Sequence, residues 1–466
     1  MSSVRVIENL QREVEPLKDA FEKAGKRLYL VGGVVRDLLL GVFEEGDTDI
    51  DLTTDATPDD IEDIVGPISD AIWLVGKRFG TVALEISRRK FEITTHRAES
   101  YDLSSRKPLV KFSTSIEEDL SRRDFTINAM AIELTGSASK LIDPFGGLHD
   151  LMGHKLATPG DAADSFSDDP LRMLRAARFM TRFTLDPEKD VVDAALELRE
   201  RLQVVSPERI REELSKLLVL PDPSVGLWFL VDTGLFDIFL PEIPALALEQ
   251  DPIHRHKDVL AHTIAVVSKT SPDLILRLAA LLHDIGKPRT REIGSAGVSF
   301  HFHDVVGARM ARKRLQALRF STQEIESVSK LVELHLRFHT YKAGWNDRAV
   351  RRYVRDAGSL LEQLNELTLA DVTTRDQAKV RFFHEKMTEL KERIQILSEQ
   401  EELASIRPEL DGNEVMAILD VGPSKDVGDA MDYLLEIRLD EGLIGKDEVT
   451  KRLLKWWRVR PISSVR

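Results

Sequence analysis

The sequence contains no cysteine among its 466 residues, so disulfide bonds and thiolate metal sites are excluded. Long apolar runs are also lacking, and no stretch approaches the roughly 20 apolar residues that a bilayer-spanning helix needs. Residues 1–17 have the pattern of an amphipathic helix that carries acids, and not that of a signal peptide. We therefore expect a cytoplasmic protein that does not cross a membrane.

A positive net charge is lacking as well, because 79 acidic residues face 65 basic ones and leave a net charge of −14. Binding to a nucleic acid would therefore depend on local stripes of Lys and Arg. Hydrophobic residues make up 42% and charged residues 31% of the chain, a balance that supports buried cores. The length predicts several domains.

Hydrophobic patterning divides the chain into a mixed part and a helical part. Short strand-like runs alternate with turns and helices in the first third, and helical periodicity dominates afterwards. We expect an α+β head with a mixed sheet, followed by an all-α neck, body and tail, with a long loop over residues 288–299. The predicted segments are an N-terminal helix (1–27), the head (28–157), the neck (158–240), the body (241–400) and the tail (401–466).

A strand predicted over residues 28–31 ends at Gly32-Gly33, and a helix is expected over residues 34–40. Glycines let a ligand approach the backbone closely, and the amides at a helix start favour anions. Arg36 in the first turn could add a charge-assisted contact to phosphate. Taken alone, the pattern is more typical of a plain tight turn.

Two aspartates, Asp49 and Asp51, follow on the next predicted strand. Residues two apart on a strand point to one face, so their carboxylates lie side by side. Such carboxylates repel each other unless a cation bridges them, as in many Mg²⁺ sites. A solvated acidic strand edge is the alternative. Glu92, on a strand predicted over residues 91–94, is either a third carboxylate of the site or an exposed strand acid.

Five ordered motifs resemble those of the class II CCA-adding enzymes and bacterial poly(A) polymerases, which belong to the polymerase-β-like nucleotidyltransferase superfamily. The motifs lie at residues 30–37 with 49–51, 122–129, 143–151, 168–179 and 208–216. The resemblance implies a polymerase-β-like head in which Asp49 and Asp51 are catalytic and bind Mg²⁺. It implies that the nucleotide is bound by Gly33, Arg36, Arg123, Asp169, Arg172, Arg175 and Arg178. Asp168 stands where the family usually has glutamate, a longer acid.

The neck motif suits nucleotide reading, because a carboxylate only accepts hydrogen bonds and a guanidinium only donates them. Asp169 and Arg172 together can therefore pair with a base edge. Arg172, Arg175 and Arg178 lie three apart on one helix face and suit a triphosphate; alternatively, they pair with acids. Glu213, in the last motif, is expected to brace the neck through salt bridges.

A second set of polar residues resembles the HD phosphohydrolase superfamily, whose pattern is His, His-Asp, further His and a final Asp. The matching residues are His262, His283, Asp284, His303, His335 and Asp371. Imidazole and carboxylate together suit a transition metal better than Mg²⁺. The resemblance leaves open whether this site hydrolyses phosphoesters.

Arg348, Arg351, Arg352 and Arg355 have the spacing of one helix face, and Arg309, Arg312 and Lys313 form another cationic face. Each is either a path for an RNA backbone or an ordinary solubilising surface.

The resemblance implies template-independent addition of CCA to the 3′ end of tRNA from CTP and ATP, with release of pyrophosphate. One alternative is a poly(A) polymerase that adds AMP to RNA. Another is an HD metal phosphohydrolase whose head only binds RNA. The sequence does not give the oligomeric state.

Overall fold

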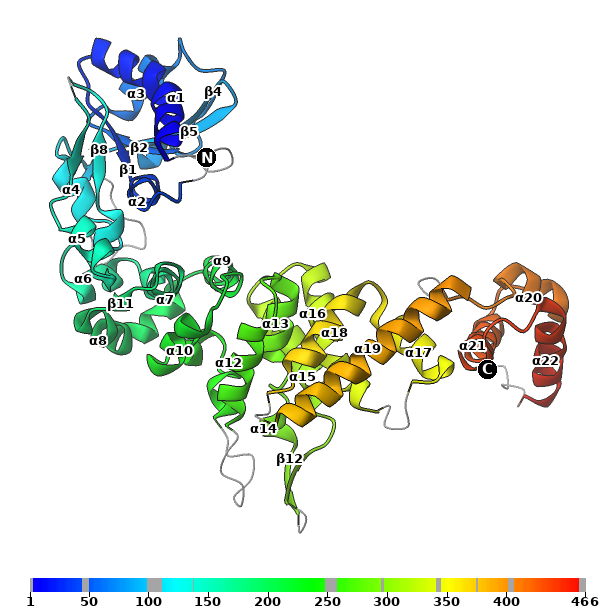
Figure 1. The fold of residues 1–466 in the computed structure, drawn as a ribbon. Helices are drawn as coiled ribbons and strands as arrows, with labels where there is room; N and C mark the ends of the chain where they lie inside the picture. The colour runs from blue at the N-terminus through cyan, green and yellow to red at the C-terminus, as the bar shows by residue number, and fades with distance from the viewer. Residues whose placement is uncertain are drawn as a thin grey trace. The chain divides into compact units, whose positions relative to one another are not determined.

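The computed structural model describes residues 3–43, 50–98, 111–136, 138–247, 258–294, 297–340, 345–373, 376–400 and 406–460. A mixed sheet in the first part is followed by helices (Figure 1), which confirms the predicted α+β class. Among the described helices, none combines the length and hydrophobicity that a membrane crossing requires. The chain forms two compact units: Met1–Leu217 with Val225–Phe239, and Leu218–Ser224 with Leu240–Arg466.

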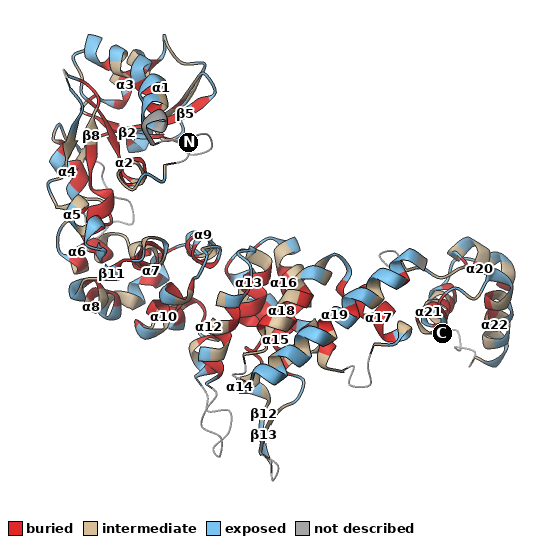
Figure 2. Ribbon diagram, in the orientation of Figure 1, coloured by how far each residue is buried: buried red, intermediate tan, exposed pale blue. Residues whose placement is uncertain are grey.

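The first unit contains a seven-stranded sheet in the order β3-β4-β5-β2-β1-β8-β9. Its strands are β1 (Leu28–Val31), β2 (Ile50–Thr54), β3 (Ala71–Trp73), β4 (Thr81–Ile86), β5 (Arg89–Thr95), β8 (Ala131–Glu133) and β9 (Lys140–Ile142). Strands β2 and β5 are parallel, and the other neighbours are antiparallel. All four residues of β1 are buried (Figure 2), as a central strand requires.

Helices of 6 to 21 residues surround this sheet. They are α1 (Ser3–Lys23), α2 (Gly33–Leu39), α3 (Pro58–Val65), α4 (Ile116–Ser121) and α5 (Gly147–Met152), with the 3₁₀ turn η2 (Thr126–Asn128). Helix α1 is amphipathic, as predicted: Leu10, Val14, Leu17 and Phe21 repeat every three or four residues and are buried.

Helices form most of the rest of the first unit, beside two short strand pairs, β6 (Arg97–Ala98) with β7 (Lys111–Phe112) and β10 (Lys155–Leu156) with β11 (Asp186–Pro187). The helices are α6 (Ala162–Asp168), α7 (Leu171–Phe183), α8 (Lys189–Leu198), α9 (Pro207–Leu218), α10 (Ser224–Asp232) and α11 (Leu235–Phe239). Gly226 of α10 packs so closely on α7 that an added Cβ would lie 2.7 Å from the carbonyl oxygen of Ala177. Glycine therefore permits this crossing.

In its described residues, the second unit consists of helices, their connecting turns and one hairpin. Its longer helices are α12 (Val259–Lys269), α13 (Leu274–Leu282), α15 (His303–Ala317), α16 (Thr322–Leu334), α17 (Asp347–Ala357), α18 (Leu361–Ala370), α19 (Gln377–Gln400), α20 (Gly412–Leu419), α21 (Lys425–Glu441) and α22 (Lys446–Val459). The loop predicted over residues 288–299 is wrong: α14 (Lys287–Thr290) is followed by the antiparallel strands β12 (Arg291–Gly294) and β13 (Gly297–Phe300). Backbone pairing outweighs the low strand propensity of this glycine-rich stretch.

Arg277 of α13 explains why residues 218–224 belong to the second unit. Its guanidinium is 1% exposed and donates to the carbonyl oxygens of Leu218 at 2.6 Å, Pro221 at 2.9 Å and Thr270 at 2.8 Å. A buried guanidinium needs acceptors for its five N–H groups, and here backbone carbonyls supply them. The interaction holds the crossing segment against the second unit.

Candidate active site and metal centre

A hollow of about 420 Å³ lies beside the sheet of the first unit. It is lined by parts of β1, β2, β4 and β5, by α4 and the turn after it, and by the start of α7. Its charged residues are Asp51, Glu92, Asp119, Arg97, Arg122, Arg123 and Arg172. Carboxylates for a cation and guanidinium groups for an anion thus share one cavity.

Asp51 and Glu92 lie side by side in this cavity. They are paired in the register of the parallel strands β2 and β5, and both are exposed. Neighbouring carboxylates that share one face favour a bound divalent cation, which relieves their repulsion. The sequence left the role of Glu92 open, and the structure places it beside Asp51. Asp49 lies outside the described residues, so its pairing with Asp51 stays a prediction.

Arg123 reaches the cavity because Gly32 has no side chain. Gly32 has a φ of 71°, and a Cβ there would lie 2.9 Å from Nη1 of Arg123. Glycine permits both the left-handed backbone conformation at this position and the close approach of the Arg123 side chain. Nη2 of Arg123 also donates to Asp119 at 3.2 Å. Gly33 is the first residue of α2, and its contact with the nucleotide stays a prediction.

Arg36 does not line the cavity, although it was predicted to contact the nucleotide. It is 4% exposed, donates to Asp37 at 2.8 Å and to the side-chain oxygen of Asn128, and lies 4.3 Å from the ring centre of Phe183. Burial lowers the pKa of Arg36, and Asp37 partly opposes this shift. Because Phe183 belongs to α7, Arg36 ties α2 to the neck.

Arg172 lines the cavity, and its role in reading the nucleotide stays a prediction. Its guanidinium donates to the hydroxyl of Ser165 at 2.7 Å and to the carbonyl oxygen of Arg122. Asp169 accepts instead from Nη2 of Arg209 at 2.9 Å. The two predicted base-reading side chains are therefore held separately, each by a neighbour with a complementary group.

The other two arginines of the predicted stripe bind buried acids. Arg175 donates to Asp124 at 2.7 Å, and Arg178 donates to Glu213 at 2.6 Å. Burial would raise the pKa of Asp124, but Arg175 and Asn128 together lower it below the ordinary value. These pairs link the head to α7 and α7 to α9. The sequence left two roles open for these arginines, contact with a triphosphate or pairing with acids, and in this structure Arg175 and Arg178 pair with acids.

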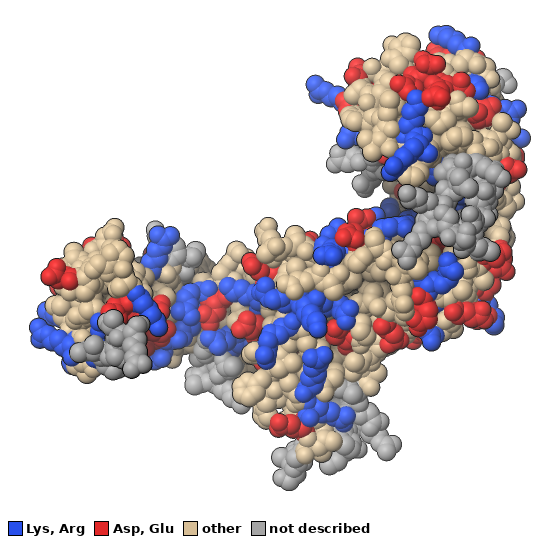
Figure 3. All heavy atoms as spheres, turned by 180° about the vertical axis from the view of Figure 1, so that it is seen from behind, with Lys and Arg blue, Asp and Glu red and all other residues tan. Residues whose placement is uncertain are grey.

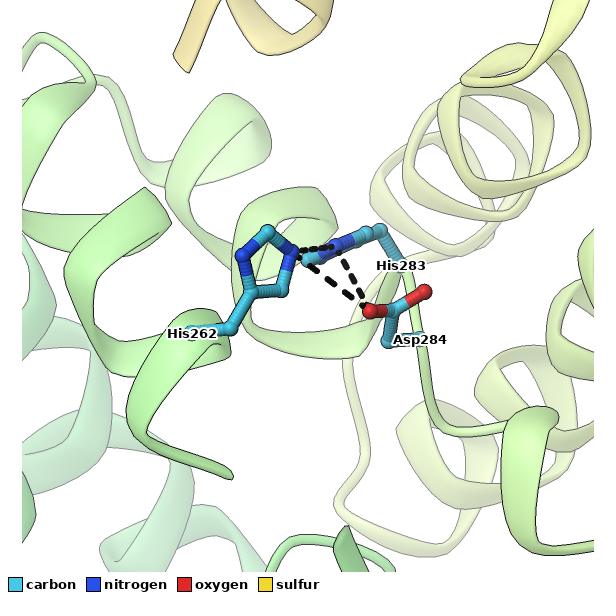
Figure 4. A group of neighbouring side chains, drawn as sticks. All are labelled: His262, His283 and Asp284. Carbon is cyan, nitrogen blue, oxygen red and sulfur yellow. Dashed lines mark hydrogen bonds and ion pairs between the residues drawn. The ribbon is translucent and has the colours of Figure 1, made fainter. Parts of the chain in front are cut away.

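The six predicted residues of the second site converge from five helices or helix ends. Figure 4 shows His262, His283 and Asp284 turned toward one another. Nε2 of His262 lies 3.0 Å from Asp371 and 3.6 Å from Asp284, and Nε2 of His283 lies 3.2 Å from Asp284. Nε2 of His303 lies 3.5 Å from Asp284, and Nε2 of His335 lies 3.3 Å from that of His303.

Three of these histidines are oriented for metal binding through Nε2. Their Nδ1 atoms donate to backbone carbonyls three residues earlier, at 2.7 Å for His283, 2.7 Å for His303 and 2.6 Å for His335. A carbonyl only accepts, so the proton is on Nδ1 and the lone pair of Nε2 faces the cluster. Burial and the neighbouring His283 lower the pKa of His335 to about 4, which keeps it neutral near pH 7.

Asp284 belongs to two potential metal-binding groups. One comprises His262, His283 and Asp284, and the other Asp284, His303 and His335. Its Oδ2 faces the first pair of histidines and its Oδ1 faces His303, so both oxygens of this carboxylate would be available to a bound cation.

Two further residues near Asp284 were missed from the sequence. Nζ of Lys287 lies 2.6 Å from Oδ2 of Asp284, and the His-Asp-x-x-Lys spacing was the available signal. A Cβ at Gly286 would lie 2.1 Å from the carbonyl oxygen of His303. Only glycine allows the start of α15 to pack this close to the turn that follows Asp284.

The arginines of the predicted RNA-binding face of α17 are engaged in contacts within the protein. Arg348 and Arg352 bind Asp440 of α21 at 2.8 and 3.0 Å, and Arg355 binds Asp356 at 2.8 Å. Arg351 is 5% exposed. The face joins α17 to α21, so its role in RNA binding stays a prediction that these contacts do not support.

Three protein families match successive parts of the chain. Residues 28–157 match the poly(A) polymerase head domain, residues 183–246 the probable RNA- and SrmB-binding site of polymerase A, and residues 259–376 the HD domain. The A-adding tRNA nucleotidyltransferase of Deinococcus radiodurans is 34% identical over 442 residues, or 92% of this chain and 95% of the relative. The chain belongs to the tRNA nucleotidyltransferase family.

Other members of this tRNA nucleotidyltransferase family match a shorter part. The CCA-adding enzyme of Bacillus velezensis is 39% identical over 233 residues, which make up 50% of this chain and 55% of that enzyme. The fold matches the Bacillus stearothermophilus CCA-adding enzyme in complex with CTP (TM-score 0.68, 22% identity, 95% of this chain and 96% of that one). It also matches the Thermotoga maritima CCA-adding enzyme complexed with tRNA (TM-score 0.61, 20% identity, 97% and 95%). The nucleotidyltransferase and HD domains imply the use of divalent metal ions.

Proposed function

We propose that the protein adds CCA to the 3′ ends of tRNA, using CTP and ATP and releasing pyrophosphate. The cavity that combines Asp51 and Glu92 with four arginines carries this proposal. A nucleoside triphosphate with its metal ions needs both kinds of group. The A-adding tRNA nucleotidyltransferase of Deinococcus radiodurans, which matches over almost the whole chain, supports tRNA as the acceptor.

The carboxylates of Asp49, Asp51 and Glu92 would hold Mg²⁺. Mg²⁺ bound there supplies activation of the RNA 3′-hydroxyl and charge neutralisation at the leaving pyrophosphate. Arg123 and Arg172 contact the nucleotide directly, since both line the cavity, and Asp169 contributes a hydrogen-bond acceptor to base reading. Gly33, Arg36, Arg175 and Arg178 act in this proposal by positioning α2 and α7.

Addition of the terminal A alone is a second candidate, because the relative that matches over almost the whole chain is A-adding. Two tRNA transcripts separate the candidates, one ending before CCA and one ending in CC. CCA addition predicts that CTP and ATP together extend the first by three nucleotides. If only the transcript ending in CC is extended, and by a single A, the protein adds the terminal A alone and the CCA-addition proposal is wrong. An unlimited A tail would indicate a poly(A) polymerase.

We infer that the HD cluster binds a transition metal and hydrolyses phosphoesters. The inward Nε2 atoms of His283, His303 and His335 and the shared Asp284 support this proposal. Elemental analysis of the purified protein and of His283→Ala tests it, together with hydrolysis of cyclic and linear phosphoester substrates. Equal metal content in both proteins would contradict it. The predicted cytoplasmic location agrees with a tRNA substrate and stays a prediction.

A further inference from the structure

A groove of about 790 Å³ in the second unit is lined mainly by α15 and α16, with Arg355 and Asp356 of α17 at its edge. We call it the α15–α16 groove, and its polar lining includes Arg309, Arg312, Lys330, Ser329, Glu326 and Glu333. Figure 3 shows Lys and Arg side chains gathered on one face of the helical second unit, although the chain as a whole is acidic. The groove contains none of the six residues of the HD cluster.

The charge of the groove is positive. Five basic side chains line it against three acidic ones. One of the acids, Asp356, already binds both Arg337 and Arg355. Arg312 and Lys330 are exposed and form no ion pair with another described residue. Exposed cations that have no ion-pair partner in the described part of the chain, in a hollow of an otherwise acidic protein, favour a polyanion.

Ser329 supplies an independent sign of a ligand. This residue is 4% exposed and lines the groove, yet its hydroxyl has no hydrogen-bond partner in the described part of the chain. A buried polar group without a partner costs about 1–3 kcal/mol, so such groups usually have a function. A phosphate oxygen held by the flanking cations would accept from this hydroxyl.

We propose that the α15–α16 groove binds the ribose-phosphate backbone of the RNA substrate. Arg309, Arg312, Lys330 and Ser329 donate to phosphate oxygens. Glu326 and Glu333 only accept, and the 2′-hydroxyl of ribose is the donor that distinguishes RNA from DNA. The identity of the RNA as tRNA rests on the proposed function, whereas binding to an RNA backbone does not.

A charge-reversal pair, Arg312→Glu with Lys330→Glu, tests the groove. The matched control is Lys23→Glu with Lys140→Glu, which changes the net charge equally at two exposed lysines of the first unit. Binding of a fluorescent tRNA transcript ending before CCA is measured by anisotropy between 50 and 200 mM salt. We expect the slope of log affinity against log salt to fall by roughly two and affinity to fall about tenfold, because two phosphate contacts are lost. The control should retain the wild-type slope.

Two further arms separate the possible ligands. Affinity for a fluorescent ATP analogue should be unchanged in the groove variant, and wild-type protein should bind a DNA oligonucleotide of the same sequence more weakly than the RNA. Equal RNA binding by variant and control would overturn the groove proposal, and a loss of ATP binding would make the groove a mononucleotide site. If the wild type binds tRNA through the groove but adds no nucleotide, the proposed function fails and the groove proposal stands.

Discussion

Glu213 is predicted to be the main electrostatic support of the neck. Its side chain is 4% exposed and accepts from Nε of Arg178 at 2.6 Å, and Arg178 is itself 9% exposed. Glu213→Leu leaves the guanidinium of Arg178 buried without its partner. Removing one member of a buried pair costs about 3–5 kcal/mol. At about 2–4 °C per kcal/mol for a unit of this size, we expect the thermal midpoint to fall by roughly 6–20 °C.

Thermal and urea unfolding of the full chain, followed by circular dichroism, measures this loss. The double variant Arg178→Met with Glu213→Leu should recover most of the stability, because apolar side chains of similar volume replace both charges. Glu212→Gln is the matched control, since this neighbour in α9 is exposed, and it should change stability by less than about 0.5 kcal/mol. A loss below about 1 kcal/mol in Glu213→Leu, or a double variant as unstable as the single one, would refute the reasoning.

Three other predictions follow from buried polar groups. Arg175 keeps the pKa of Asp124 below its ordinary value, so the ionised Asp124 stabilises the fold above about pH 4, and this stabilisation is lost as the pH falls further. The urea midpoints of the wild type and of Asp124→Asn should therefore converge between pH 6 and pH 3. Midpoints that stay equally far apart over this range would contradict this. Arg277→Met should destabilise the second unit by about 3 kcal/mol, measured by amide hydrogen exchange of residues 218–220, because several carbonyls lose a charged donor; unchanged exchange would exclude the bracing role. Asp284→Asn should abolish bound metal in elemental analysis and leave nucleotide addition within about twofold, whereas a parallel loss of addition would show that the two sites are coupled.

The elements that carry the site could be predicted from local patterns. The strand at residues 28–31, the glycine turn after it and the strand with Asp51 each have a short-range signal in the sequence. The order of His262, His283, Asp284, His303, His335 and Asp371 also indicated a cluster, and the structure brings the six residues together.

The partners of the arginines could not be predicted, because they are distant in sequence. Arg178 binds Glu213, which is 35 positions away, and Arg175 binds Asp124, which is 51 positions away. Helical spacing correctly placed these arginines on one face of α7, but it does not say which acid faces them. For the same reason, the cationic face of α17 gave no sign that Asp440 of α21 lies against it.

Nucleotide addition by Asp51→Asn tests the central claim most directly. The assay measures CMP and AMP incorporation into a tRNA transcript ending before CCA, with Asp63→Asn as the control because Asp63 is an exposed acid of α3 outside the cavity. The account predicts that the wild type and the control add CCA, and that Asp51→Asn is slower by at least about 10³-fold because a metal ligand is lost. Addition by Asp51→Asn at the wild-type rate would contradict the account.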